Sequence, residues 1–197
     1  KPGDRVFVEN PGYRGARYAL GRHGNPLLPV PLKQQVLDVG VLDSLGAAKL
    51  LFCTPTHQYP MGGILDVSQR MAFLQWARRN QTWIVEDDYD GEYRFAGRPL
   101  EALKRLDNHQ QVAYLGTFSK VLHASFRMGY IVMPDGLRDA LLQAKFLSDA
   151  YSNALTQRAL GHLIEQGDFA RHLRRMQRRY TGRSNRLLAA LETVSDF

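Results

Sequence analysis

Residues 112–120, with the sequence VAYLGTFSK, join an apolar segment directly to a polar loop. Val112–Leu115 has the apolar and aromatic composition of a buried strand. Gly116–Lys120 follows it with two hydroxyls, a glycine and a lysine. Hydroxyls and backbone N–H groups suit phosphate oxygens, and a lysine in a partly buried site can act as a nucleophilic amine. The glycine spacing of a P-loop is absent, and an exposed polar loop without a ligand is the alternative interpretation.

Apolar segments with β-branched or aromatic residues alternate with helical patterns along the rest of the chain. The other predicted strands are Arg5–Glu9, Leu27–Leu32, Lys49–Thr54, Thr82–Glu86 and Met128–Met133. The predicted helices are Tyr13–Arg22, a helix from Asp66 to Asn80, and a mostly helical region from Leu137 to Leu191 with breaks near residues 149–153 and 166–168. This alternation predicts an α/β fold with a parallel or mostly parallel sheet.

The helix that follows Asp66 has a start signal in the sequence. Asp66 is a good N-cap residue, and Gln69 three positions later completes a capping-box pattern. Its predicted apolar face consists of Met71, Leu74 and Ala77, with Phe73 and Trp76 beside them.

The polar segments that follow three of the predicted strands fall on one edge of the sheet. In parallel sheets, ligands bind beyond the carboxyl ends of the strands. Pro55–Gly63, Asp87–Gly91 and Gly116–Val121 each follow a predicted strand directly. We therefore expect a binding site where these three segments meet.

Asp87 and Asp88 follow a very apolar strand, and Tyr89 comes next. One interpretation is a turn held by Asx-type side-chain bonds. The other is a carboxylate at the end of a buried strand that pairs with a cation, such as a protonated heterocyclic nitrogen. The acidic segment Glu86–Asp90 has no His or Cys at ligand spacing, so we expect no metal site.

The composition of the 197 residues is that of an ordinary globular protein, with 44% hydrophobic and 23% charged residues. It excludes collagen, coiled-coil and disordered classes, and no apolar run is long enough to span a membrane. The net charge of +7 equals the seven arginines between Arg171 and Arg186, a stretch with no acidic residue. A solvated helix face or a nucleic-acid contact explains such a stretch. Cys53 is the single cysteine and is expected to be buried, in a reducing, cytoplasmic compartment.

Together these segments resemble the fold-type-I enzymes that use pyridoxal phosphate (PLP). The chain is most similar to the aminotransferase-like domain of MocR-type transcription regulators of the GntR family. The resemblance rests on ENPGYRGAR (residues 9–17), TPTHQYPMG (54–62), VEDDYDGEY (85–93), YLGTFSKVL (114–122) continuing to RMGY (127–130), and GDFARHLRRM (167–176). It covers nearly the whole chain, and it implies a three-layer αβα large domain with a mostly parallel sheet, truncated at both ends.

The resemblance also implies roles for individual residues. Lys120 is the lysine that forms the internal aldimine with PLP and then shuttles a proton. Asp87 pairs with the pyridinium nitrogen and keeps the ring an electron sink. Tyr89 binds the ring hydroxyl oxygen, and Tyr13 stacks on the ring face.

The resemblance also implies the residues that bind the phosphate, and the chain departs from the pattern of many aminotransferases at one position. Thr117, Ser119 and Arg127 hold the phosphate, where the arginine fork can donate two bonds at once. Many aminotransferases have an asparagine where this chain has Tyr59, so the bond of that asparagine to the ring hydroxyl comes from elsewhere or is missing. The aromatic residue favours the MocR-type interpretation over an ordinary transaminase.

The expected organisation is residues 1–150 as a partial PLP-binding large domain and residues 151–197 as a helical connection toward a small domain. The resemblance implies an upstream phosphate loop, a downstream small domain and a homodimer, so we expect the chain alone to be inactive. Three hypotheses follow: an effector domain that senses an amino compound and acts on DNA through an N-terminal winged helix, the large domain of an active aminotransferase, and a nucleic-acid-binding module.

Overall fold

The computed structural model describes residues 1–93 and 100–193, which divide into two compact units. The first unit comprises Lys1–Gly91 and Leu100–Leu142 and contains the sheet. The second comprises Glu92–Pro99 and Gln143–Phe197. The expected assignment of residues 1–150 and 151–197 to two partial domains stays a prediction.

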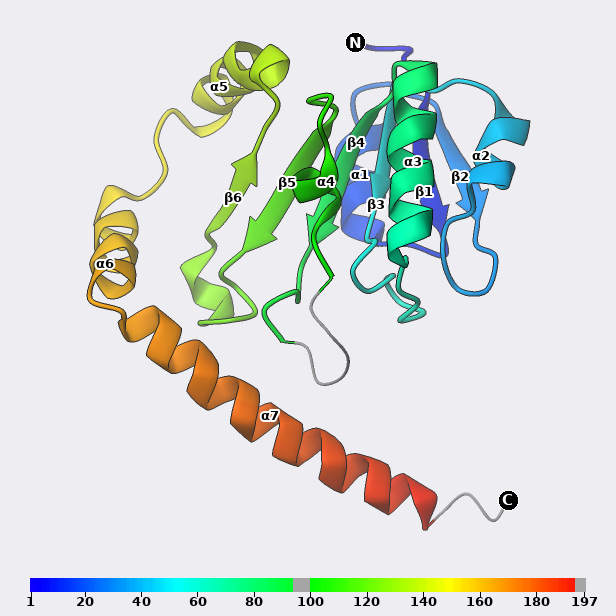
Figure 1. The fold of residues 1–197 in the computed structure, drawn as a ribbon. Helices are drawn as coiled ribbons and strands as arrows, with labels where there is room; N and C mark the ends of the chain where they lie inside the picture. Colours follow the sequence, from blue (N-terminus) through cyan, green and yellow to red (C-terminus); the bar gives the residue numbers. More distant parts are fainter. Residues whose placement is uncertain (94–99, 194–197) are drawn as a thin grey trace. The chain divides into compact units, whose positions relative to one another are not determined.

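The sheet of the first unit has six strands in the described residues, in the order β2-β1-β3-β4-β5-β6 (Figure 1). Their bounds are β1 (Val6–Asn10), β2 (Leu27–Pro31), β3 (Leu50–Cys53), β4 (Trp83–Asp88), β5 (Val112–Thr117) and β6 (Gly129–Val132). All neighbouring pairs are parallel except β5 and β6, which are antiparallel. The prediction of an α/β fold with a mostly parallel sheet is confirmed.

Helices cover both faces of this sheet, which gives the three-layer αβα arrangement (Figure 1). Alternate strand residues point to opposite faces. Phe7 and Leu51 pack with α2 (Val39–Leu45), α3 (Val67–Asn80) and α4 (Leu103–Leu106) in the larger core. Val8 and Phe52 pack on the opposite face with α1 (Arg14–Gly21). Cys53 is fully buried in the larger core, as the sequence predicted.

The start of α3 confirms the capping box. The Asp66 side chain accepts the N–H of Gln69 at 2.8 Å, and the Gln69 side chain accepts the N–H of Asp66 at 2.8 Å. The predicted apolar face was wrong in one residue, because Met71 is 40% exposed. The buried apolar residues of the helix are Phe73, Leu74, Trp76 and Ala77.

β4 runs two residues further than the sequence predicted. Asp87 and Asp88 pair with Leu115 and Gly116 of β5, so they belong to the strand and not to the turn after it. A strand places successive side chains on opposite faces. The two carboxylates therefore lie in different surroundings although they are adjacent in sequence.

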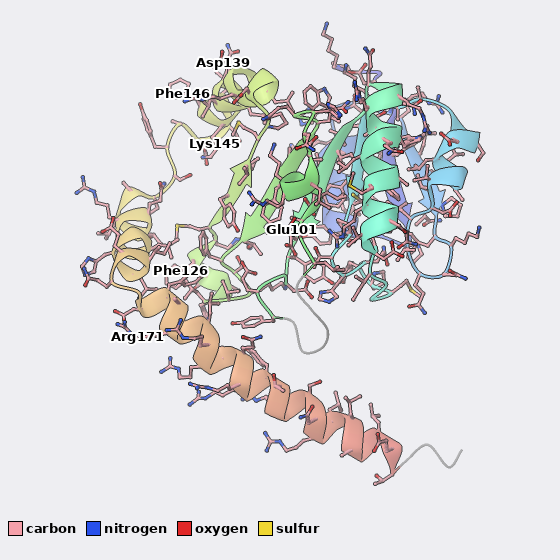
Figure 2. The ribbon with its side chains drawn as sticks, viewed as in Figure 1. Glu101, Phe126, Asp139, Lys145, Phe146 and Arg171 are labelled. Atoms are coloured by element: carbon pink, nitrogen blue, oxygen red, sulfur yellow. The ribbon has the colours of Figure 1, made fainter. Side chains whose placement is uncertain are left out.

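The second unit is helical in its described residues. α5 (Asp135–Asp149) begins in the first unit and ends in the second, and is followed by α6 (Ala154–Glu165) and α7 (Asp168–Glu192). The predicted breaks near residues 149–153 and 166–168 are confirmed. Figure 2 shows Lys145 on α5, where its Nζ lies 2.6 Å from Asp149 Oδ2, and Arg171 near the start of α7, where it pairs with Asp168.

The arginines of α7 lie on its exposed side. All seven are exposed, whereas Leu173, Met176 and Tyr180 are partly buried. The Tyr180 ring contacts the ring of Tyr93 with centroids 5.0 Å apart. This pattern is that of a solvated basic face over an apolar stripe. Within the described residues, no helix is both long enough and apolar enough to cross a membrane.

Candidate functional site

A pocket of about 500 Å³ lies in the first unit, beside the carboxyl ends of β3, β4 and β5. It brings together all eight residues that the sequence predicted as a site. It is lined by Tyr13, Thr54, Tyr59, Asp87, Tyr89, Thr117, Ser119, Lys120, Ala124, Arg127, Met128 and Gly129. Each of the three polar segments expected at this edge contributes to the lining. Thr54, which directly follows β3, was missed in the sequence.

The end of β5 and the loop after it form the basic, hydroxyl-rich side of the pocket. Thr117 Oγ1 accepts the N–H of Ser119 at 3.2 Å, and the exposed Lys120 side chain follows. The 3₁₀ turn η1 (Ala124–Phe126) then brings Arg127 back to the pocket in the left-handed region, at φ 49°. An amine, two hydroxyls and a guanidinium thus face one space.

Two glycines allow the close pairing of β5 with β6 at this edge. Gly116 pairs with Tyr130, and a Cβ on Gly116 would overlap the Tyr130 ring. Gly129 pairs with Thr117, where a Cβ would lie 2.8 Å from the Gly116 carbonyl oxygen. Thr117, which lines the pocket, therefore pairs with Gly129 in closely spaced strands.

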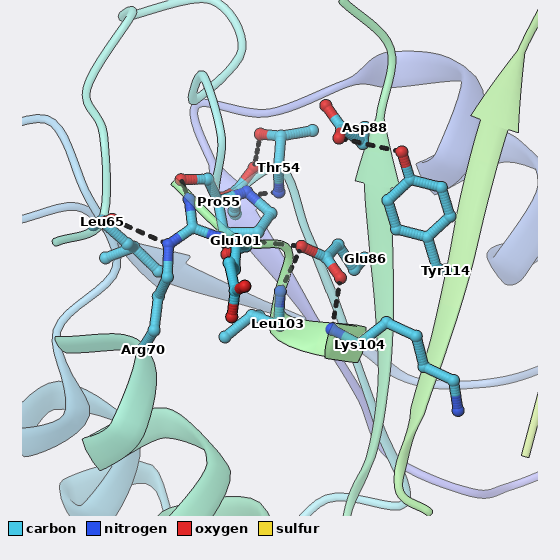
Figure 3. Close-up of polar contacts among 11 residues, drawn as sticks. Thr54, Pro55, Leu65, Arg70, Glu86, Asp88, Glu101, Leu103, Lys104 and Tyr114 are labelled. Atoms are coloured by element: carbon cyan, nitrogen blue, oxygen red, sulfur yellow. Dashed lines mark hydrogen bonds and ion pairs between the residues drawn. The ribbon is translucent and has the colours of Figure 1, made fainter. Parts of the chain in front are cut away.

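Asp87 and Asp88 differ in what they contact. Asp87 lines the pocket, and burial raises its pKa to about 6, with Asp88 and Asp90 adding to the effect. Asp88 points to the other face of β4, where its Oδ2 accepts the Tyr114 hydroxyl at 2.9 Å (Figure 3). Burial also raises the pKa of Asp88. The pocket therefore holds one carboxylate that keeps its charge above pH 6.

Three tyrosine rings line a further wall of the pocket. Tyr59 lies between Tyr13 and Tyr89, with ring centroids 5.9 Å and 6.0 Å apart and interplanar angles of 88° and 89°. Such edge-to-face contacts are the favoured geometry of aromatic pairs. Burial, together with Asp90 and Asp87, raises the pKa of Tyr89 to about 12, so its phenol stays protonated and can donate.

The sequence model of the aminotransferase class I and II family matches residues 1–197. The chain belongs to this family. It is 40% identical over 187 residues to the probable rhizopine catabolism regulatory protein MocR of Rhizobium meliloti, covering 95% of this chain and 38% of that protein. It is 32% identical to the uncharacterized HTH-type transcriptional regulator YdeL of Bacillus subtilis, covering 98% of this chain and 41% of YdeL.

The solved structures similar to this chain include an aminotransferase. The Pyrococcus horikoshii kynurenine aminotransferase, solved in complex with PMP, superposes with a TM-score of 0.91 at 32% identity. The match covers 98% of this chain and 50% of that enzyme. The chain therefore spans half or less of the length of each of these three relatives.

Membership of the aminotransferase class I and II family implies PLP as the cofactor. The side chains of the pocket fit this group chemically. An amine suits the aldehyde, a buried carboxylate suits the ring nitrogen, and two hydroxyls with a guanidinium suit the phosphate. Among the described residues, no group of three or more His, Cys, Asp and Glu side chains is arranged to hold a metal ion.

A buried ion pair between Arg70 and Glu86 lies in the first unit (Figure 3). Arg70 is fully buried and donates to the carbonyl oxygens of Leu65 at 2.9 Å, Pro55 at 3.1 Å and Glu101 at 3.1 Å. Its Nη1 lies 3.8 Å from Glu86 Oε1. This arginine joins α3, the segment after β3 and the chain before α4. Nothing in the sequence pattern distinguished it from a surface arginine.

Glu86 is the acidic partner of that pair and also caps α4. Its two oxygens accept the N–H groups of Leu103 at 2.8 Å and Lys104 at 2.9 Å. Burial raises its pKa to about 7, against the opposing effect of these bonds and of Arg70. These two bonds attach the start of α4 to β4.

His57 and Asp90 link two segments of the pocket edge. His57 Nδ1 lies 2.9 Å from Asp90 Oδ1, with both side chains partly buried. The bond to Asp90 gives it a packing role between the segments after β3 and β4.

Proposed function

We propose that this chain is the PLP-binding, aminotransferase-like effector domain of a transcription regulator that senses an amino compound. The observation that carries the proposal is the convergence of Lys120, Asp87 and the phosphate-type donors on one pocket. The 40% identity with a protein named as a regulator supports the regulatory side of the proposal.

In this proposal, the side chains at the ring hold the cofactor and place its charges. Lys120 supplies the amine that attaches the cofactor and moves the proton at its own Nζ. Asp87 keeps a proton on the ring nitrogen, and Tyr89 donates to the ring hydroxyl oxygen. Tyr13 stacks on the ring, and Tyr59 stands between the two tyrosines. When bound, PLP supplies an electron sink for bonds to the α-carbon of an amino compound.

We assign the phosphate group to the side chains of Thr117, Ser119 and Arg127. Thr117 and Ser119 offer hydroxyls, and Arg127 offers a planar fork of N–H donors. Thr117 is the last residue of β5, and Ser119 and Arg127 lie in the segment that joins β5 to β6.

The remaining partners are part of the same proposal. An amino compound is the effector, and DNA is bound through an N-terminal domain outside these 197 residues. We further propose a homodimer in the cytoplasm, with residues 151–197 as the connection to a small domain. The exposed arginines of α7 are assigned to solvent and not to a nucleic-acid site.

The second candidate is the large domain of a catalytically active class I and II aminotransferase. The TM-score of 0.91 with the kynurenine aminotransferase favours this second candidate. The pocket residues themselves suit an enzyme and a sensor equally. Tyr59, where many aminotransferases have asparagine, favours the regulator.

The full-length protein distinguishes these two candidates. Its affinity for the DNA upstream of its own gene is measured with PLP alone and with PLP plus a panel of amino compounds, beside a turnover assay with 2-oxo acid acceptors. We expect DNA affinity to change with one amino compound and turnover to be absent. Turnover at enzyme rates without any effect on DNA binding would establish the aminotransferase instead.

Asp87→Asn is expected to weaken PLP binding more than Asp88→Asn. Only Asp87 lines the pocket, and a lost charged hydrogen bond corresponds to about 10- to 100-fold in affinity. Asp88→Asn keeps an oxygen for the Tyr114 hydroxyl and is the matched control. PLP titration of both variants in the full-length protein is the measurement, and equal losses would show that the wrong carboxylate was chosen.

A further inference from the structure

Glu9 is a buried carboxylate directly behind the pocket, at the carboxyl end of β1. Its side chain is 3% exposed and does not line the pocket. Oε2 accepts the Thr54 hydroxyl at 2.6 Å and the Gln58 side-chain N–H at 3.1 Å, and Oε1 accepts the Thr54 backbone N–H at 3.2 Å. In each of these three hydrogen bonds the carboxylate is the acceptor.

Thr54 links Glu9 to the tyrosine wall, the three rings of Tyr13, Tyr59 and Tyr89 that line the pocket. Its hydroxyl donates to Glu9 and at the same time accepts the backbone N–H of Tyr59 at 3.0 Å. Gln58 makes a second link, since its Nε2 lies 2.7 Å from the Tyr59 carbonyl oxygen and 3.0 Å from that of Pro11. The backbone N–H and the carbonyl oxygen of Tyr59 are thus each bound by a residue that also binds the Glu9 carboxylate.

The position of the Tyr59 ring affects the rings of Tyr13 and Tyr89, which it contacts. It is the middle ring of the wall and contacts Tyr13 on one side and Tyr89 on the other. Gly12, in the segment that leads to Tyr13, packs so closely on Glu9 that an added Cβ would lie 2.5 Å from the Glu9 carbonyl oxygen. A change at the Glu9 carboxylate therefore reaches Tyr59 through Thr54 and Gln58, whereas the contact with Gly12 is made mainly by the Glu9 backbone.

The donors around Glu9 favour an ionised acceptor. The oxygen–oxygen distance of 2.6 Å is that of a hydroxyl bound to a carboxylate. Burial raises the pKa of Glu9 to about 6, while the bonds from Thr54 and Gln58 oppose that rise and the charge of Asp87 adds to it. Arg17 donates to the Glu9 carbonyl oxygen at 2.7 Å, on the backbone and not the side chain.

We propose that Glu9 is a positioning residue that holds Tyr59, through Thr54 and Gln58, in the wall of the pocket and thereby sets the affinity for PLP. The statement about affinity rests on the proposed function, whereas the statement about Tyr59 does not.

Glu9→Gln in the full-length protein tests the proposal, because an amide turns an N–H₂ toward groups that are themselves donors. The matched control is Glu86→Gln, which changes another buried carboxylate whose N–H donors, Leu103 and Lys104, lie outside the tyrosine wall. The proteins are labelled with 3-fluorotyrosine, and Tyr59→Phe identifies the Tyr59 fluorine resonance by its loss. PLP is then titrated into each unlabelled variant.

We expect Glu9→Gln to shift the Tyr59 resonance of the ligand-free protein and to weaken PLP binding by about tenfold, the worth of one hydrogen bond to a charged group. Glu86→Gln is expected to leave the Tyr59 resonance and the affinity as in the wild type. If Glu9→Gln does not fold, Thr54→Val decides in its place, since it removes the hydroxyl that joins Glu9 to Tyr59 and is expected to shift the same resonance.

The outcomes separate the two proposals. A wild-type protein that binds no PLP contradicts the proposed function, and the fluorine resonance alone then decides the role of Glu9. An unshifted Tyr59 resonance in Glu9→Gln, or in Thr54→Val where the first variant is unfolded, overturns the positioning role. A shifted Tyr59 resonance with unchanged PLP affinity overturns the proposal that Glu9 sets the affinity for PLP.

Discussion

Replacing Lys120 by alanine is expected to abolish the absorbance band near the visible edge that PLP gives with the full-length protein and that borohydride removes. Among the described residues that line the pocket, Lys120 supplies the only amine. Without it, PLP has no primary amine to attach to in this space, so the loss is complete and not partial.

Lys104→Ala is the control for that experiment. Lys104 lies on α4, away from the pocket lining, and it is its backbone N–H that binds Glu86. This variant is expected to keep the band. A borohydride-sensitive band that survives in Lys120→Ala would show that another lysine binds PLP, and the assignment of the pocket would be wrong.

Arg70→Met is expected to lower the free energy of unfolding by about 3–5 kcal/mol, the range for breaking a buried ion pair from one side. The change leaves Glu86 without its cation and removes the donors to three backbone carbonyls. Urea unfolding followed by circular dichroism is the measurement.

Arg79→Met provides the comparison on the same helix. Arg79 lies 3.4 Å from Asp43 with both side chains more than half exposed, and such surface pairs contribute about 0–1 kcal/mol. Similar losses in the two variants would mean that the buried arginine matters only through the packing of its side chain.

The sequence was sufficient where local patterns decide the structure. Apolar strands, the capping box at Asp66 and the breaks before α6 and α7 were all predicted. α2 was missed because its seven residues include Gly40, Asp43 and Ser44, which have low helix propensity. α4 was missed because its first N–H groups are capped by Glu86, a residue on a strand 17 positions earlier.

The eight site residues were predicted as a set because each follows a strand or belongs to a motif that resembles a known family. The residues behind them were not. Arg70 and Glu9 have ordinary local surroundings in the sequence, and their roles come from partners brought together only in the folded chain. The most distant hydrogen-bond partner of the Glu9 side chain, Gln58, is 49 positions away in the sequence. Thr54 was placed in a strand, and its contact with the pocket depends on that same packing.

The raised pKa of Asp87 couples cofactor binding to proton exchange with the buffer. Near pH 6 about half of the ligand-free molecules carry a proton on this carboxyl, because burial raises its pKa to about 6. A protonated ring nitrogen beside it favours the ionised form and lowers that pKa, so the carboxyl gives up its proton on binding. The calorimetric heat of PLP binding measured near pH 6 should therefore vary with the ionisation enthalpy of the buffer, and this contribution should disappear in Asp87→Asn.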